Sequence, residues 1–319
     1  MSNALLYAIT VLVWGSTWLA IEFQLGVVAP EVSVVYRYAG ASLLLFAWCR
    51  VRGLRLTFGA AEHARFVLLG LLLFGLNYIL TYRAQIYISS ALTAIVFTSI
   101  VWLNIINARI FFGVRTDRRV LVGALLGVAG IVTLFAPQVS ELTLSDTVLY
   151  GCMLAGLAAM IASFGNMVSQ SAQKGGLPVV QSNAWGMFYG TVITALIALY
   201  RGHDFVFDWS AGYVASLAYL TVFGSIIAFG AYLTLLGRIG AHKAGYAMVM
   251  FPVVALVLSA IFEDLEITAS VVIGTLLVLV GNVFVLNTRI RRRRRAVHEP
   301  SQASPATPRD GLGVRVDHG

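Results

Sequence analysis

Two charged side chains lie inside or at the end of long apolar runs, where a charge is costly and usually faces a cavity or a partner. Arg37 lies about two turns into the second run. Its planar guanidinium is suited to a carboxylate or phosphate, so it is a candidate for substrate binding. Alternatively, it reaches the lipid headgroups or pairs with Glu22. Glu22 ends the first run and is the candidate for proton coupling, the alternative being a solvated helix end.

Neutral polar groups and aromatic rings inside the runs form a second set of candidates. Asn77 and Asn104 lie near the middle of the third and fourth runs, where an amide either orients a substrate or hydrogen-bonds a neighbouring helix. Pro252 breaks a helical hydrogen bond and frees a carbonyl oxygen, which makes Phe251 and Pro252 the best backbone candidates for a site. The aromatic residues that would line an amphipathic pocket, or else face lipid, include Trp14, Tyr78, Trp185 and Tyr246.

Motifs typical of enzymes do not occur in the sequence. There is no nucleotide-binding loop, metal-ligand cluster or nucleophile elbow, so we expect no enzymatic activity and no cofactor or metal. The histidines lie outside the apolar runs, which argues against a histidine proton relay. Any transport must therefore be driven by a gradient and not by ATP.

The overall composition indicates a membrane protein. Apolar residues make up 59 % of the 319 residues and charged residues only 11 %. A soluble domain carries about 25 % charged residues, so this composition excludes a water-soluble enzyme domain. The apolar runs are far longer than the roughly ten residues of a membrane β-strand and do not alternate in polarity. We therefore predict an all-α polytopic membrane protein.

Ten runs are long enough to cross a bilayer. When the two halves of the chain are aligned, Val101 in the fourth run corresponds to Pro252 in the ninth. Because proline kinks a helix, we expect the fourth helix to be straighter than the ninth. The predicted helices span about 4–22, 32–49, 66–82, 89–111, 120–136, 147–170, 179–200, 211–236, 244–262 and 268–288.

The basic residues beside these runs are distributed unevenly. Seventeen fall on the side of the N-terminus, and only Arg83 and Arg201 on the other. The positive-inside rule then places both termini in the cytoplasm, with the protein in a bacterial-type inner membrane. The tail 289–319 starts with the run Arg291–Arg295 and continues as a disordered segment. Because the run follows a membrane helix directly, we expect it to contact anionic lipid headgroups and no nucleic acid.

The two halves of the chain are related by a shift of 151 residues, which pairs Gly123 with Gly274 and Gly130 with Gly281. The halves, 4–136 and 147–288, then contain five helices each. Five is odd, so the second half enters the membrane from the opposite side. This arrangement is an inverted repeat, which is common in secondary transporters.

Short motifs in both halves resemble those of EamA-type transporters in the drug/metabolite transporter superfamily. The first half contains Trp14-Gly15-Ser16-Thr17 and Tyr36-Arg37-Tyr38. The second half contains Gly237-Arg238-Ile239-Gly240-Ala241, then Phe251-Pro252-Val253 and Phe262-Glu263. The resemblance covers about 4–290. It implies ten helices, cytoplasmic termini and export of small metabolites such as amino acids by proton antiport.

Together these features predict a secondary transporter that exports small metabolites by alternating access between two inverted five-helix repeats, with the substrate near mid-membrane. Two alternatives stay open. The first alternative is a membrane receptor or scaffold without transport activity. The second is a transporter that takes its substrate up instead of exporting it.

Overall fold

The computed structural model describes the chain except residues 135, 137–144, 252, 255–267 and 287–319. In the described part, the regular secondary structure is helical, which confirms the predicted all-α class. Pro252 and the run Arg291–Arg295 lie outside the described residues.

Seven helical segments in the described part are long and apolar enough to cross a membrane. Four of them are continuous α-helices: α1 (Asn3–Glu22), α2 (Pro30–Val51), α9 (Asp146–Lys174) and α10 (Val179–Tyr200). Their starts follow from local chemistry. The Ser2 hydroxyl caps α1 by accepting from the Leu5 amide, and Pro30 opens α2 at a position whose N–H has no helical partner. The predicted count of ten spans stays a prediction.

Two of the spans contain a π-helical turn in their middle. In the first, α3 (Ala60–Leu69) passes through the π-turn η1 (Gly70–Leu76) into α4 (Asn77–Tyr87). In the second, the corresponding elements are α11 (Ala211–Tyr219), η2 (Leu220–Ile227) and α12 (Ala228–Ile239). Apolar periodicity predicted both spans but not the widened turns, which frequently occur at functional sites.

The fourth span is interrupted as well, although it contains no proline. Helix α5 (Ser90–Phe97) ends before Thr98 and Ser99, and α6 (Ile100–Phe112) begins after them. The Thr98 hydroxyl donates to the Ile95 carbonyl oxygen at 2.6 Å, a local bond of the kind that bends helices. That the fourth helix is straighter than the ninth stays a prediction, because Pro252 and residues 255–262 of the ninth lie outside the described residues. In the ninth segment, α13 (Ala241–Ala244) continues into the 3₁₀ turn η3 (Gly245–Met250).

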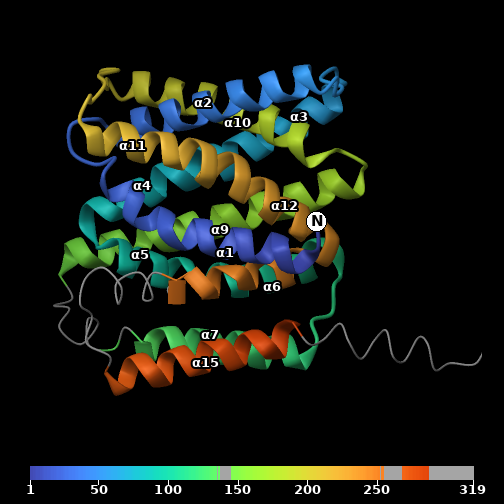
Figure 1. Cartoon of the computed structure of the whole chain (residues 1–319), viewed down its shortest axis with the longest axis vertical. Helices are drawn as coiled ribbons and strands as arrows, with labels where there is room; N and C mark the ends of the chain where they lie inside the picture. Colours follow the sequence, from blue (N-terminus) through green and yellow to red (C-terminus); the bar gives the residue numbers. More distant parts are fainter. Residues whose placement is uncertain (135, 137–144, 252, 255–267, 287–319) are drawn as a thin grey trace, which may run out of the picture.

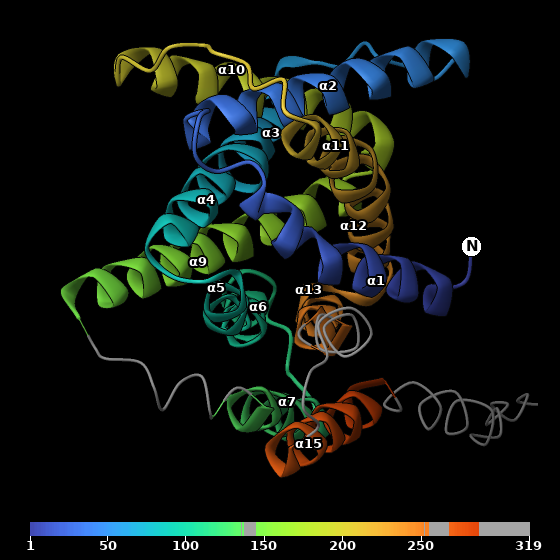
Figure 2. The ribbon, with the colours of Figure 1, turned by 60° about the vertical axis from the view of Figure 1, so that its left-hand side comes forward.

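The helices lie side by side in layers (Figure 1). Helices α2, α3 and α10 form one edge, and α7 (Arg118–Leu134) pairs with α15 (Ala269–Leu286) at the opposite edge. Figure 2 shows that α1, α4, α9 and α12 fill the space between these edges. This central layer contains the side chains that form the candidate site.

Glycines permit the close contact between α7 and α15. A Cβ atom added at Gly130 would lie 2.7 Å from the Gly274 carbonyl oxygen, and one added at Gly274 would lie 2.6 Å from the Gly130 carbonyl oxygen. The backbones therefore touch directly, as small residues allow between membrane helices.

We expect Gly130→Ala to lower the free energy of unfolding by about 1 kcal/mol, because the added methyl group has no space between the two backbones. Gly230→Ala is the matched control, since a Cβ atom there would meet nothing within 4 Å. Unfolding in mixed micelles measures both variants. Equal stability of Gly130→Ala and the wild type would show that α7 and α15 separate without loss.

Candidate functional site

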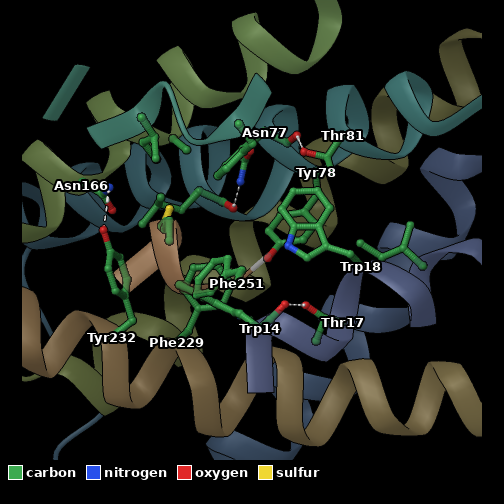
Figure 3. Close-up of a pocket in the computed structure, with 16 residues that line it drawn as sticks. Trp14, Thr17, Trp18, Asn77, Tyr78, Thr81, Asn166, Phe229, Tyr232 and Phe251 are labelled. Carbon is green, nitrogen blue, oxygen red and sulfur yellow. Dashed lines mark hydrogen bonds between the residues drawn. The ribbon is translucent and has the colours of Figure 1, made fainter. Parts of the chain in front are cut away.

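A cavity lies at the centre of the bundle, between α1, α4, α9 and α12, with the turns η1 and η3 completing its wall (Figure 3). The space free of protein atoms amounts to about 530 Å³, including the part open to solvent. The lining residues that the structure describes carry no charge; the aromatic ones are Trp14, Trp18, Tyr78, Phe97, Phe229, Tyr232 and Phe251, and the neutral polar ones are Thr17, Asn77, Thr81 and Asn166.

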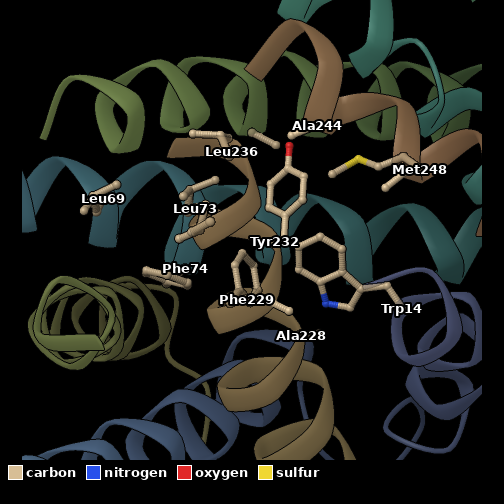
Figure 4. Packing of buried hydrophobic residues seen from close by; sticks show 14 of the residues in the cluster. Trp14, Leu69, Leu73, Phe74, Ala228, Phe229, Tyr232, Leu236, Ala244 and Met248 are labelled. Atoms are coloured by element: carbon tan, nitrogen blue, oxygen red, sulfur yellow. The ribbon is translucent and has the colours of Figure 1, made fainter. Parts of the chain in front are cut away.

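Trp14, in the middle of α1, is held in place by contacts from three sides. Its indole Nε1 donates to the Gly224 carbonyl oxygen in η2 at 2.9 Å. Its ring meets the edge of Phe229 at 4.7 Å between centroids and that of Phe251 at 5.9 Å. Figure 4 shows Trp14 packed beside Phe229 and Tyr232 in the buried core. The indole therefore forms a rigid apolar wall with its only donor already used.

Asn77 and Tyr78 open helix α4 directly after the π-turn. The Asn77 side chain is buried, and its Nδ2 donates to the Leu73 carbonyl oxygen at 3.4 Å. Its Oδ1 has no hydrogen-bond partner among the described residues. One turn later, the Thr81 hydroxyl returns to the Asn77 carbonyl oxygen at 2.9 Å. The cavity therefore has a free acceptor on this wall.

Arg37 lies behind the wall that Tyr78 forms. Its side chain is buried, with 1 % exposure, and its Nε donates to the Ser225 hydroxyl in η2 at 2.8 Å. The guanidinium carbon lies 4.5 Å from the centroid of the Tyr78 ring, within the range of a cation–π contact. Nη1 approaches the Tyr82 hydroxyl at 3.5 Å.

These contacts settle two alternatives for Arg37. The side chain does not extend to the headgroups, since it is enclosed by protein. The ion pairs between described residues all involve Glu31, so Arg37 does not pair with Glu22. A buried cation without a carboxylate partner is expensive. The guanidinium stacks on Tyr78, which also lines the cavity.

The other predicted site residues are not all brought to the cavity. Asn104 touches it through Asn166, whose Nδ2 donates to the Asn104 Oδ1 at 3.2 Å. Trp185 lies elsewhere, with its Nε1 donating to the Leu56 carbonyl oxygen at 3.2 Å and its ring against His63. Tyr246 also lies outside the cavity lining, with its hydroxyl donating to a carbonyl oxygen of α7 at 2.6 Å.

Glu22 at the end of α1 and Glu31 in the first turn of α2 differ in their surroundings. Glu22 is exposed at the end of α1. Glu31 is fully buried, and its Oε1 accepts from the Arg83 Nε at 2.8 Å. Arg201 Nε lies 3.9 Å from the same oxygen, and His203 Nε2 lies 3.5 Å from Oε2. Arg83 and Arg201 are the two basic residues that the sequence analysis places on the side opposite to the N-terminus, and both lie near the Glu31 carboxylate. Because basic residues are scarce on that side, the sequence could have suggested this pairing.

Comparison with known proteins identifies the family of the chain. The model of the EamA-like transporter family matches residues 1–136 and 149–287. The chain belongs to the EamA-like transporter family. It is therefore a multi-pass membrane protein of a family of transporters.

Individual relatives agree with this assignment. The chain is 25 % identical over 285 residues to the uncharacterized transporter YoaV of Bacillus subtilis. The aligned region covers 87 % of this chain and 95 % of YoaV. It is 28 % identical over 254 residues to the uncharacterized inner membrane transporter YedA of Escherichia coli, covering 77 % and 78 %. A solved crystal structure superposes with a TM-score of 0.74 over 92 % of this chain and 98 % of its own, at 19 % identity. That likeness supports the fold.

Proposed function

We propose that this EamA-family protein is a secondary transporter that exports small amphipathic metabolites such as amino acids. The observation that supports this proposal best is the central cavity, whose aromatic walls suit an apolar group and whose amides suit a polar one. Arg37 behind Tyr78 is suited to a substrate carboxylate. Under the proposal Tyr78 yields to the carboxylate, so that the guanidinium gains an anionic partner.

Alternating access between two inverted five-helix repeats is the proposed mechanism, with ten helices in total. Three features support it. The family model matches the chain twice. The π-turns η1 and η2 interrupt their spans at corresponding places. The close contact between Gly130 and Gly274 recurs between their counterparts in the other half, Gly281 and Gly123. The proposed halves are 4–136 and 147–288.

The proposed setting is a bacterial-type inner membrane with both termini in the cytoplasm. The support is the uneven distribution of basic residues together with the inner-membrane assignment of YedA. The tail 289–319 then lies in the cytoplasm, where Arg291–Arg295 is proposed to contact anionic headgroups.

Transport itself is tested by counterflow in proteoliposomes. A metabolite-leakage screen of overexpressing and deletion cells supplies the candidate compounds. Exchange of a labelled compound across the vesicle wall is the expected result. A receptor or scaffold would bind without exchange. Greater accumulation inside the overexpressing cells would indicate uptake in place of export.

Proton coupling is the second part of the proposal, with Glu22 as the candidate carrier. We expect Glu22→Gln to abolish flux driven by a pH gradient while counterflow stays measurable, because exchange needs no net proton movement. Asp146→Asn, an exposed change in the first turn of α9, is the control. Unchanged gradient-driven flux in Glu22→Gln would identify Glu22 as a solvated helix end and place coupling elsewhere.

A further inference from the structure

Two adjacent residues of the π-turn η2 each hold a side chain from another helix. The Gly224 carbonyl oxygen accepts from the indole Nε1 of Trp14 on α1 at 2.9 Å. The Ser225 hydroxyl accepts from the Nε of Arg37 on α2 at 2.8 Å. The turn therefore fixes both an aromatic wall of the cavity and the buried guanidinium.

Ser225 is fully buried, and its hydroxyl makes a second bond that fixes its role toward Arg37. The hydroxyl donates to the Leu220 carbonyl oxygen at 2.9 Å. Leu220 lies five residues earlier, which is the hydrogen-bonding distance of a π-turn. A serine hydroxyl has one proton and two lone pairs. Because the proton is used within the turn, the oxygen presents a lone pair to the Arg37 Nε.

The bond to Nε determines which edge of the guanidinium is left for a ligand. The five N–H donors of arginine lie in one plane. With Nε bound to Ser225, the terminal nitrogens Nη1 and Nη2 form the remaining edge, and such an edge suits two parallel bonds to a carboxylate. Nη1 only approaches the Tyr82 hydroxyl, at 3.5 Å. The Tyr78 ring, which also lines the cavity, stacks on the guanidinium and restrains its plane.

Gly224 leaves room for this edge of the guanidinium. A Cβ atom added at Gly224 would lie 3.1 Å from the Arg37 Nη2 and 3.2 Å from the Thr17 Cγ2. Thr17 lines the cavity, where Figure 3 shows it next to Trp14. The terminal edge of Arg37 and the cavity lining therefore adjoin the same glycine, and a side chain there would push against both.

We infer that Gly224 and Ser225 are positioning residues, which hold the terminal nitrogens of Arg37 available to a substrate carboxylate. They thereby set the preference of the site for a carboxylate over a neutral group. This inference rests on the proposed function, in which Arg37 meets the substrate carboxylate. A serine that only ties α2 to η2 would affect the amount of folded protein and leave this preference unchanged.

Two probes that differ only in the carboxylate test the inference, phenylalanine and phenylalaninamide. Titration calorimetry measures their binding to the purified full chain in lipid nanodiscs. The wild type is expected to bind phenylalanine at least about tenfold more tightly, the lower end of what a hydrogen bond to a charged group accounts for. Ser225→Ala is expected to lower this preference about three- to tenfold, because Nε loses its acceptor. Gly224→Ala is expected to lower it as well, because the methyl group displaces Nη2.

Matched controls separate positioning from general effects on folding. Ser42→Ala removes another buried hydroxyl that contacts α2 and α10, where it donates to the Ala184 carbonyl oxygen at 3.2 Å. Gly230→Ala adds a methyl group where nothing lies within 4 Å. Both are expected to keep the preference for phenylalanine. An undiminished preference in Ser225→Ala would contradict the inference, and where that variant folds poorly, an undiminished preference in Gly224→Ala does so.

Arg37→Gln distinguishes this inference from the proposed function. A preference lost in Arg37→Gln but kept in Ser225→Ala and Gly224→Ala overturns only the positioning role of η2. A preference that survives in Arg37→Gln overturns the proposed carboxylate contact itself. Equal affinity of the wild type for both probes, or binding of neither, overturns the contact and the inference that rests on it. Counterflow tests transport separately, since carboxylate preference without exchange contradicts transport alone.

Discussion

Replacing Arg37 by glutamine is expected to lower transport roughly 10- to 100-fold, the range that a charge-assisted hydrogen bond to a substrate carboxylate would account for. Arg37→Lys should lower it less, because lysine keeps the charge but loses the planar fork and the stacking on Tyr78. Initial rates of counterflow, normalised to the amount of protein in the vesicles, measure both. Arg50→Gln is the control, since it is exposed on the same helix.

The structural alternative for Arg37 predicts a different order of effects. If Arg37 only holds α2 against η2 through Ser225, both substitutions should reduce membrane abundance before they reduce the rate per molecule. Full transport by Arg37→Lys and Arg37→Gln at normal abundance would remove Arg37 from the site. The polar contacts would then be sought at Asn77 and Asn166.

Replacing Glu31 by glutamine is expected to lower the free energy of unfolding by about 3 kcal/mol, the lower end of the range for breaking a buried ion pair. The change removes the carboxylate on which Arg83 and His203 converge. Arg201 contributes little, because its side chain is 46 % exposed. Unfolding in mixed micelles measures the loss, and Glu22→Gln is the exposed control.

The pairing with Arg83 is isolated by a double-mutant cycle. In the Glu31→Gln background, Arg83→Gln should cost much less than it does in the wild type, because the partner is already absent. Additive losses would show that the two side chains stabilise the protein independently. An unchanged midpoint for Glu31→Gln would show that the carboxylate stabilises nothing in the fold.

Composition and periodicity predicted the all-helical membrane fold because the bilayer requires long apolar runs. They could not predict the π-turns, since Gly70–Leu76 and Leu220–Ile227 are as apolar as the rest of their spans. The break at Thr98 was missed for a related reason, because no proline marks it; the Thr98 hydroxyl bonds to the Ile95 carbonyl oxygen there.

Part of the cavity lining was among the candidates taken from the sequence, and a role of these residues in binding stays a prediction. Trp14, Asn77, Tyr78 and Phe251 all line the cavity. They lie near the middle of the predicted spans, and depth along a span can be counted from the sequence. Depth does not reveal which side of a helix faces the centre. Trp185 therefore packs against His63 and lies outside the cavity lining. Tyr232 gave no signal, since it is one aromatic residue among many in apolar surroundings.

The central claim, that the cavity is the substrate site of a transporter, is tested most directly by filling it. Ala162 lines the cavity, and Ala162→Phe adds a ring there, whereas Leu157→Phe adds one on an exposed part of the same helix. Counterflow is measured in proteoliposomes with a compound from the leakage screen. The account predicts exchange by the wild type and Leu157→Phe, and loss of exchange by Ala162→Phe at equal abundance. Undiminished exchange by Ala162→Phe would contradict it.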